Sequence, residues 1–116
     1  MPEYNFEYDV TKYTQDPTIR ISRYSIMLNS KAAQCLNNPK RINIGFDVDN
    51  KVICIRQASL DKSIKSFSAT PTKTGQIRIN SKALINKISE ITQVDYSLHS
   101  TRYILDLVNG YLLLKL

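Results

Sequence analysis

The chain has 116 residues and a mass of 13.3 kDa, and 42% of its residues are hydrophobic, 9% aromatic and 22% charged. This composition is typical of one compact domain and argues against a disordered or collagen-like chain. The 16 basic residues outnumber the 10 acidic ones, so the formal charge of +6 favours nucleic acid, an anionic membrane or an acidic protein face as a partner. Solubility alone is the competing explanation for this charge.

Residues 1–17 form an acidic, aromatic N-terminal arm. The first 19 residues carry a net charge of −3, so the rest of the chain carries +9. Tyr4, Phe6 and Tyr8 alternate with other residues, which predicts an edge strand that completes the core. A partner-binding segment and an acidic cover for the basic surface are the functional alternatives. The arm does not resemble a secretory signal, and the sequence has no apolar run of membrane-spanning length. We therefore expect a cytoplasmic protein with no membrane partner.

Two strands, a helix and a hairpin are predicted between residues 18 and 57. Alternating apolar residues indicate strands at 18–24 and 25–29, and Asn29 or Ser30 can cap a short helix that runs through Leu36. Strands at 41–48 and 51–57 follow around an Asp-Asn turn. Cys54 lies in the apolar run of the last strand and is expected to be a small buried hydrophobic residue.

Residues 58–65 are expected to join this unit to a second one at 66–116 that has the same plan. The second unit begins with strands at 66–70 and 76–80 and continues with a longer helix at 81–92. The helix is expected to face the core with Ala83, Leu84, Ile88 and Ile91. The final two strands are predicted within 95–108 and at 111–116, around the hairpin signal Asn109-Gly110.

Two sequence blocks occur in the same order in both units. IMLNSKA at 26–32 matches IRINSKA at 77–83 in five of seven positions, and DVDNKVICIR at 47–56 corresponds to DLVNGYLLLK at 106–115. One such unit is too small to bury a large core by itself. We therefore predict an α+β, β-rich single domain made of two tandem β-β-α-β-β units, 18–57 and 66–116, related by a pseudo-twofold axis and containing two short helices.

The repeated unit resembles the swapped-hairpin, DNA-binding half-domain of AbrB/MazE-type transition regulators and antitoxins. Residues 25–56 and 74–88 carry the resemblance, with Asn29 and Asn80 standing where that family has proline. The resemblance implies an intramolecular version of a dimer that binds DNA. The chain is also loosely similar to small phage and mobile-element proteins that have no assigned activity.

The resemblance implies that basic residues of the first two strands and their turn contact phosphates. Arginine can donate bidentately to phosphate or guanine, whereas lysine supplies a point charge. The candidate nucleic-acid-binding residues of the two units are Arg20, Arg23, Lys31, Lys73, Arg78 and Lys82. The alternative to nucleic-acid binding is that the basic strand residues only form a solvated face. Lys31 and Lys82, at the helix starts, would then be packing positions.

Enzymatic function is the least favoured class, because the sequence contains no phosphate-binding loop or hydrolase motif and only one histidine, His99. His99 is interpreted as an exposed strand residue rather than as part of a nucleophilic site with Ser100. Cys35 and Cys54 are 19 residues apart and form no zinc motif, and the Asp47–Asn50 segment lacks the glycine and the final acid of a calcium loop. No catalytic residue, metal or cofactor is predicted.

We therefore expect a non-enzymatic DNA-binding regulator that uses a basic strand face of both units. The alternative is a phage or mobile-element inhibitor that binds a host protein such as a defence nuclease or polymerase. In either case the partner is DNA or another acidic macromolecular surface, and the protein itself is a monomer or a homodimer.

Overall fold

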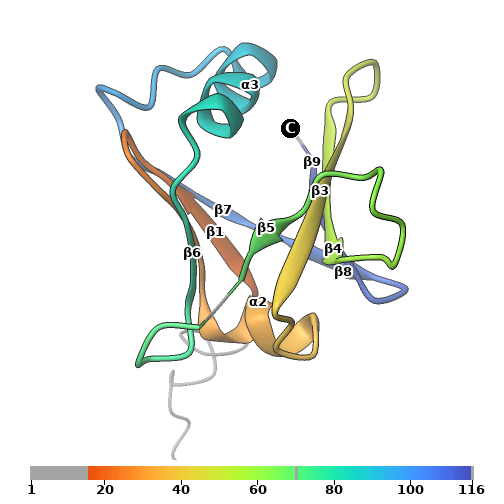
Figure 1. Cartoon of the computed structure of the whole chain (residues 1–116). Coiled ribbons are helices and arrows are strands. Elements are labelled where there is room, and N and C mark those ends of the chain that lie inside the picture. Colours follow the sequence, from red (N-terminus) through yellow and green to blue (C-terminus); the bar gives the residue numbers. More distant parts are fainter. Residues whose placement is uncertain (1–15, 70, 116) are drawn as a thin grey trace, which may run out of the picture.

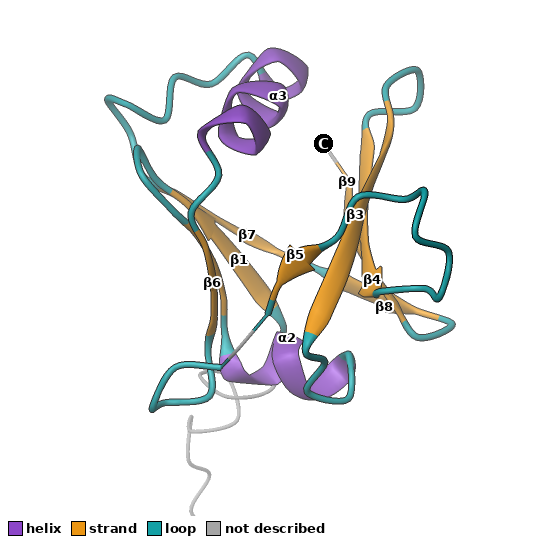
Figure 2. Cartoon of the chain, in the orientation of Figure 1, coloured by secondary structure: helices purple, strands orange, loops and turns teal. Residues whose placement is uncertain are grey.

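The computed structural model describes residues 16–69 and 71–115, and the predicted edge strand of the N-terminal arm lies outside them. The strands of the described part form two antiparallel sheets (Figures 1 and 2). Sheet A has four strands, in the order β6 (Ile77–Ile79), β2 (Ile26–Leu28), β1 (Thr18–Ile21) and β7 (Thr101–Ile104). Sheet B has five strands, in the order β5 (Phe67–Ser68), β3 (Arg41–Asp47), β4 (Val52–Gln57), β9 (Tyr111–Lys115) and β8 (Asp106–Val108). The β-rich α+β class predicted from the sequence is confirmed.

The two sheets are connected at both of their edges. β7 of sheet A continues through the buried Leu105 directly into β8 of sheet B. At the other side, the segment after β5 reaches Pro71, which forms an isolated bridge with Ile77 of β6. The chain thus encloses one core between the sheets. We expected residues 95–108 to form a single strand region, and this prediction is wrong. Residues 96–98 form a turn, and the strand that follows is divided at Leu105. The amide of Leu105 donates a hydrogen bond to the Pro17 carbonyl (2.9 Å).

Two helices occupy opposite ends of the described structure (Figure 1). α2 (Ser30–Cys35) begins at Asn29, whose side-chain oxygen accepts from the Ala32 amide at 2.8 Å. α3 (Lys82–Thr92) begins at Ser81, whose hydroxyl accepts from the Leu84 amide at 3.2 Å. Short polar side chains are well suited to this role because the first amides of a helix have no partner within it. The predicted helix positions are therefore confirmed.

The core consists mainly of isoleucine and leucine from the inner faces of both sheets, closed by residues of the two helices. On α3 the buried residues are Leu84, Ile85 and Ile88, whereas Ala83 is exposed. The prediction that Ala83 faces the core is wrong, because the buried stripe of the helix is rotated toward Ile85.

Cys54 corrects a second burial prediction. It is only half-buried, because its neighbours Ile53 and Ile55 occupy the inner face of β4 and the alternation of a strand turns Cys54 outward. Burial raises the pKa of its thiol above the usual value, which keeps the thiol protonated near neutral pH.

Both predicted hairpin turns form. Asn109 and Gly110 adopt φ angles of 50° and 81°, the left-handed backbone that the Asn-Gly pair favours. At the β3–β4 turn, Asp47 accepts hydrogen bonds from the amide and the side chain of Asn50. The loop after β4, residues 58–66, is anchored to sheet B, since Asn43 bonds the Ser59 amide and the Lys65 carbonyl.

One strand pair in each sheet has a register that involves the repeated sequence blocks. In the β2–β6 pair, Met27 lies opposite Arg78, and these are equivalent positions of IMLNSKA and IRINSKA. In the β4–β9 pair, Cys54 lies opposite Leu113, and these are equivalent positions of the two terminal blocks. In both pairs, the residue that precedes this position in one block lies opposite the residue that follows it in the other block.

Candidate nucleic-acid interface

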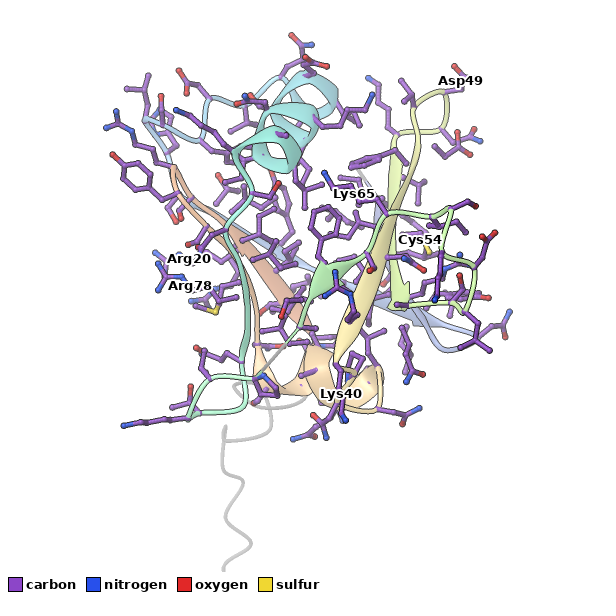
Figure 3. The ribbon with its side chains drawn as sticks, in the orientation of Figure 1. Arg20, Lys40, Asp49, Cys54, Lys65 and Arg78 are labelled. Carbon is purple, nitrogen blue, oxygen red and sulfur yellow. The ribbon has the colours of Figure 1, made fainter. Side chains whose placement is uncertain are left out.

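A row of arginine side chains crosses the exposed face of sheet A. The register places Arg78 of β6 opposite Met27 of β2, Met27 opposite Arg20 of β1, and Arg20 opposite Arg102 of β7. In each strand the neighbours of these residues point inward and are wholly or partly buried, so the row faces outward. Figure 3 shows Arg20 and Arg78 projecting from the same side of the sheet. We call Arg78, Arg20 and Arg102 the arginine row.

The arginine row lies in a shallow hollow of about 530 Å³. Besides the arginines and Met27, the lining is polar and uncharged: Thr18, Ser22, Ser25, Asn29, Gln76 and Ser100. No carboxylate is among these lining residues. An ion pair between side chains is found among the residues that the structure describes, but it lies in sheet B and not in this hollow. It joins Lys115 and Asp106 (3.8 Å). The hollow therefore presents positive charge and hydrogen-bond donors, which suits an anionic ligand.

One member of the row is held in place by a side-chain hydrogen bond. Arg20 Nε donates to the Ser100 hydroxyl at 2.8 Å, which links β1 to the segment just before β7. This bond uses one of the five N–H donors of the guanidinium and leaves the outer fork for a ligand. All three arginines of the row are exposed. Their guanidinium groups are thus available for bidentate contacts with phosphate oxygens.

The structure brings together two of the six residues predicted from the sequence, Arg20 and Arg78. Arg23 lies beyond them, in the β1–β2 turn, with its guanidinium 5.2 Å from the ring centroid of Tyr24. Hydrogen bonds from Ser97 are the main cause that lowers the pKa of Asp95, and the charges of His99 and Arg23 lower it further. Arg23 does not line the hollow and is not part of the arginine row.

The three predicted lysines are dispersed. Lys31 is half-buried in the first turn of α2, whereas Lys82 is exposed at the start of α3, at the opposite end of the structure (Figure 1). Lys73 lies in the exposed turn before β6, the same turn in which a Cβ added at Gly75 would be 3.5 Å from Ser30 Cβ of α2. Lys31, Lys73 and Lys82 do not line the hollow.

Sequence reasoning missed Arg102, the third arginine of the row. No repeat block covers it, because the match between the two units begins only at Asp106 in this part of the chain. A usable signal was present: Arg102 and Ile104 alternate with Thr101 and Tyr103, and such alternation predicts one exposed strand face. Sequence alone does not show that this strand pairs with β1.

His99 is exposed but lies in the loop before β7, so its predicted place in a strand is wrong. Over residues 16–69 and 71–115, no group of three or more His, Cys, Asp or Glu side chains could hold a metal ion. None of the helices described is long and apolar enough to cross a membrane.

Comparisons with protein-family models, curated proteins and solved structures find no match to this chain. A function for the chain is therefore inferred from the geometry of sheet A.

Proposed function

We propose that the protein is a non-enzymatic DNA-binding protein that contacts phosphates through the arginine row of sheet A. The observation that carries this proposal is the alignment of Arg78, Arg20 and Arg102 across one sheet face that is exposed in the described part of the chain and has no lining carboxylate there. Like charges in directly opposed positions of a sheet are unfavourable without a ligand. An anionic ligand removes this repulsion, and the net charge of +6 favours its approach. The resemblance to AbrB/MazE-type regulators supports a regulatory role.

The experiment is a titration of fluorescently labelled duplex DNA, followed by anisotropy, at several salt concentrations. Two or three phosphate contacts predict a slope of about −1.8 to −2.7 for log K against log salt. Changing all three arginines of the row to Ala should abolish most of the binding. Lys62→Ala is the matched control, since Lys62 is exposed in the loop attached to sheet B. Binding that does not depend on salt, or no binding even at low salt, would contradict the proposal.

We also propose that the domain is a duplicated, intramolecular form of the AbrB/MazE-type dimer. The support comes from the strand registers, because equivalent positions of the repeat face each other in both sheets: Met27 with Arg78, and Cys54 with Leu113. An antiparallel pair of equivalent strands related by a twofold axis has this register. The two units differ elsewhere, since β3 is one long strand whereas β7 and β8 belong to different sheets.

Light scattering tests the intramolecular arrangement. A chain that contains both halves of the dimer should give a particle near 13.3 kDa. A swapped dimer of two whole chains should give twice this mass and would contradict the proposal. The measurement should be repeated at high salt, so that association through charge is not mistaken for a structural dimer.

A second candidate function, inhibition of a host protein, is supported by exposed apolar side chains near one edge of sheet B. Leu107 and Val108 of β8 and Tyr111 of β9 are 52%, 40% and 42% exposed, and Val108 lies opposite Tyr111. Exposed apolar residues of this kind suit a protein partner. Affinity capture from a nuclease-treated bacterial lysate should then recover one stoichiometric protein. Contacts that disappear with the nucleic acid would count against this function.

A further inference from the structure

The width of the arginine row restricts how DNA can lie on sheet A. Neighbouring strands are about 4.8 Å apart, so the Cα atoms of Arg78 and Arg102, three strand intervals apart, are separated by about 14 Å. The major groove of B-form DNA is about 12 Å wide and accepts an α-helix or a two-stranded ribbon. A four-stranded face is too wide to enter it. Base edges in the major groove are thus out of reach of the row.

The composition of the face argues against single-stranded nucleic acid. Sheets that bind single strands stack unpaired bases on exposed aromatic side chains. None of the residues that line the hollow is aromatic. The aromatic residue next to Arg102, Tyr103, points to the other side of the strand, where its hydroxyl is 2.7 Å from the Tyr96 hydroxyl. The lining of the hollow therefore offers donors to phosphates but no platform for bases.

The minor groove matches the row better. It is about 6 Å wide and has a phosphate backbone along each side. Arg78 and Arg102 stand at the two ends of the row, and Arg20 lies between Met27 and Arg102. The outer two arginines can therefore reach the two backbones while Arg20 lies near the groove. Arginine is favoured in a narrow minor groove because the negative potential is enhanced there.

We propose that the arginine row straddles the minor groove of duplex DNA, with Arg78 and Arg102 on opposite phosphate backbones and Arg20 facing the groove between them. This inference rests on the proposed DNA binding and adds the form of nucleic acid and the groove. Recognition then depends on the width of the minor groove rather than on base edges in the major groove. Narrow A-tract DNA should bind more tightly than G·C-rich DNA of equal length.

The test compares four labelled probes of equal length at one salt concentration: an A-tract duplex, a mixed-sequence duplex, a G·C-rich duplex and the mixed sequence as a single strand. We expect the A-tract duplex to bind several-fold more tightly than the G·C-rich one, and the single strand to bind weakest. Netropsin, which occupies the minor groove, should displace the protein from A-tract DNA, whereas the major-groove dye methyl green should not. Equal affinity for single and double strands, or displacement by methyl green alone, would overturn the proposal.

Three variants separate the roles within the row. Arg78→Ala and Arg102→Ala should each reduce the salt slope by about 0.9, because each removes one phosphate contact. Arg20→Ala should instead reduce the preference for A-tract DNA over G·C-rich DNA. A preference that is unchanged in Arg20→Ala would contradict the placement of Arg20. Absence of binding to every probe at low salt is a different outcome, since it contradicts DNA binding itself. Unchanged circular dichroism and cooperative thermal unfolding establish that the variants are folded.

Discussion

Arg20 of β1 and Arg102 of β7 are directly opposed on the exposed face of sheet A, although both side chains are positively charged. A directly opposed like-charge pair destabilises an antiparallel sheet. The hydrogen bond from Arg20 to Ser100 orients one guanidinium but does not neutralise it. The pair therefore lowers the stability of the free protein at the position where an anionic ligand would raise it.

Replacing Arg102 by Gln should stabilise the free protein and weaken DNA binding. Removal of the repulsion from Arg20 is expected to raise the free energy of unfolding by about 0.2–1 kcal/mol. Urea denaturation measures this change, and the anisotropy titration measures the loss of affinity. Lys62→Gln, which makes the same change of charge in the loop attached to sheet B, should alter neither quantity appreciably. A less stable Arg102→Gln protein would show that Arg102 has a structural role instead.

The two asparagines at equivalent positions of the repeat should respond differently to replacement. Asn29 accepts hydrogen bonds from the amides of Ala32 and Thr18 at 2.8 and 3.0 Å and donates to the Asp16 carbonyl. Asn29→Ala should therefore cost about 1–2 kcal/mol of unfolding free energy. Asn80 is exposed and precedes the actual cap of α3, so Asn80→Ala should be close to neutral. Equal losses in the two variants, measured by chemical denaturation, would contradict these assignments.

Tyr96 should make stability fall at high pH. Burial is the main cause that raises the pKa of its hydroxyl, which bonds to Thr92 and Tyr103. A group whose pKa is raised on folding contributes stability that is complete below its unfolded pKa, about 10, and is lost as the pH rises toward the folded value. Unfolding measured between pH 8 and 11 should show this fall, and Tyr96→Phe should reduce its slope. Tyr24, which is exposed, provides the control as Tyr24→Phe. An equal slope in wild type and Tyr96→Phe would be inconsistent with this role.

The carboxylate of Asp47 should titrate below its usual range. Its pKa is lowered mainly by the side-chain hydrogen bond from Asn50, with a further contribution from the Asn50 amide. Because the folded pKa is depressed, the associated stability is present above the unfolded pKa, about 3.9, and is lost as the pH falls through the folded value. NMR titration of the Asp47 side chain should show the low pKa in the wild type. Asn50→Ala should move it back toward the ordinary value, and no change in that variant would contradict the assignment.

Local sequence signals predicted the elements whose geometry is decided locally. Asn29 and Ser81 have side chains that can cap a helix, and the Asn109-Gly110 pair accepts the left-handed backbone of a hairpin turn. The division of the last strand region at Leu105 was not predicted, because it depends on which sheet each half joins. Placing Arg102 in the arginine row required the pairing of β7 with β1, a contact between residues about 80 positions apart.

The continuity of β7 and β8 also affects how the face can respond to a ligand. The backbone that carries Arg102 cannot shift without disturbing Leu105 and the strand pairs on both of its sides. The spacing of the arginine backbones is therefore fixed before any ligand arrives, and only the side chains must become ordered on binding. Such preorganisation reduces the conformational entropy lost in complex formation. It also means that a duplex whose groove does not match this spacing must itself deform, so the flexibility of the DNA becomes a determinant of affinity.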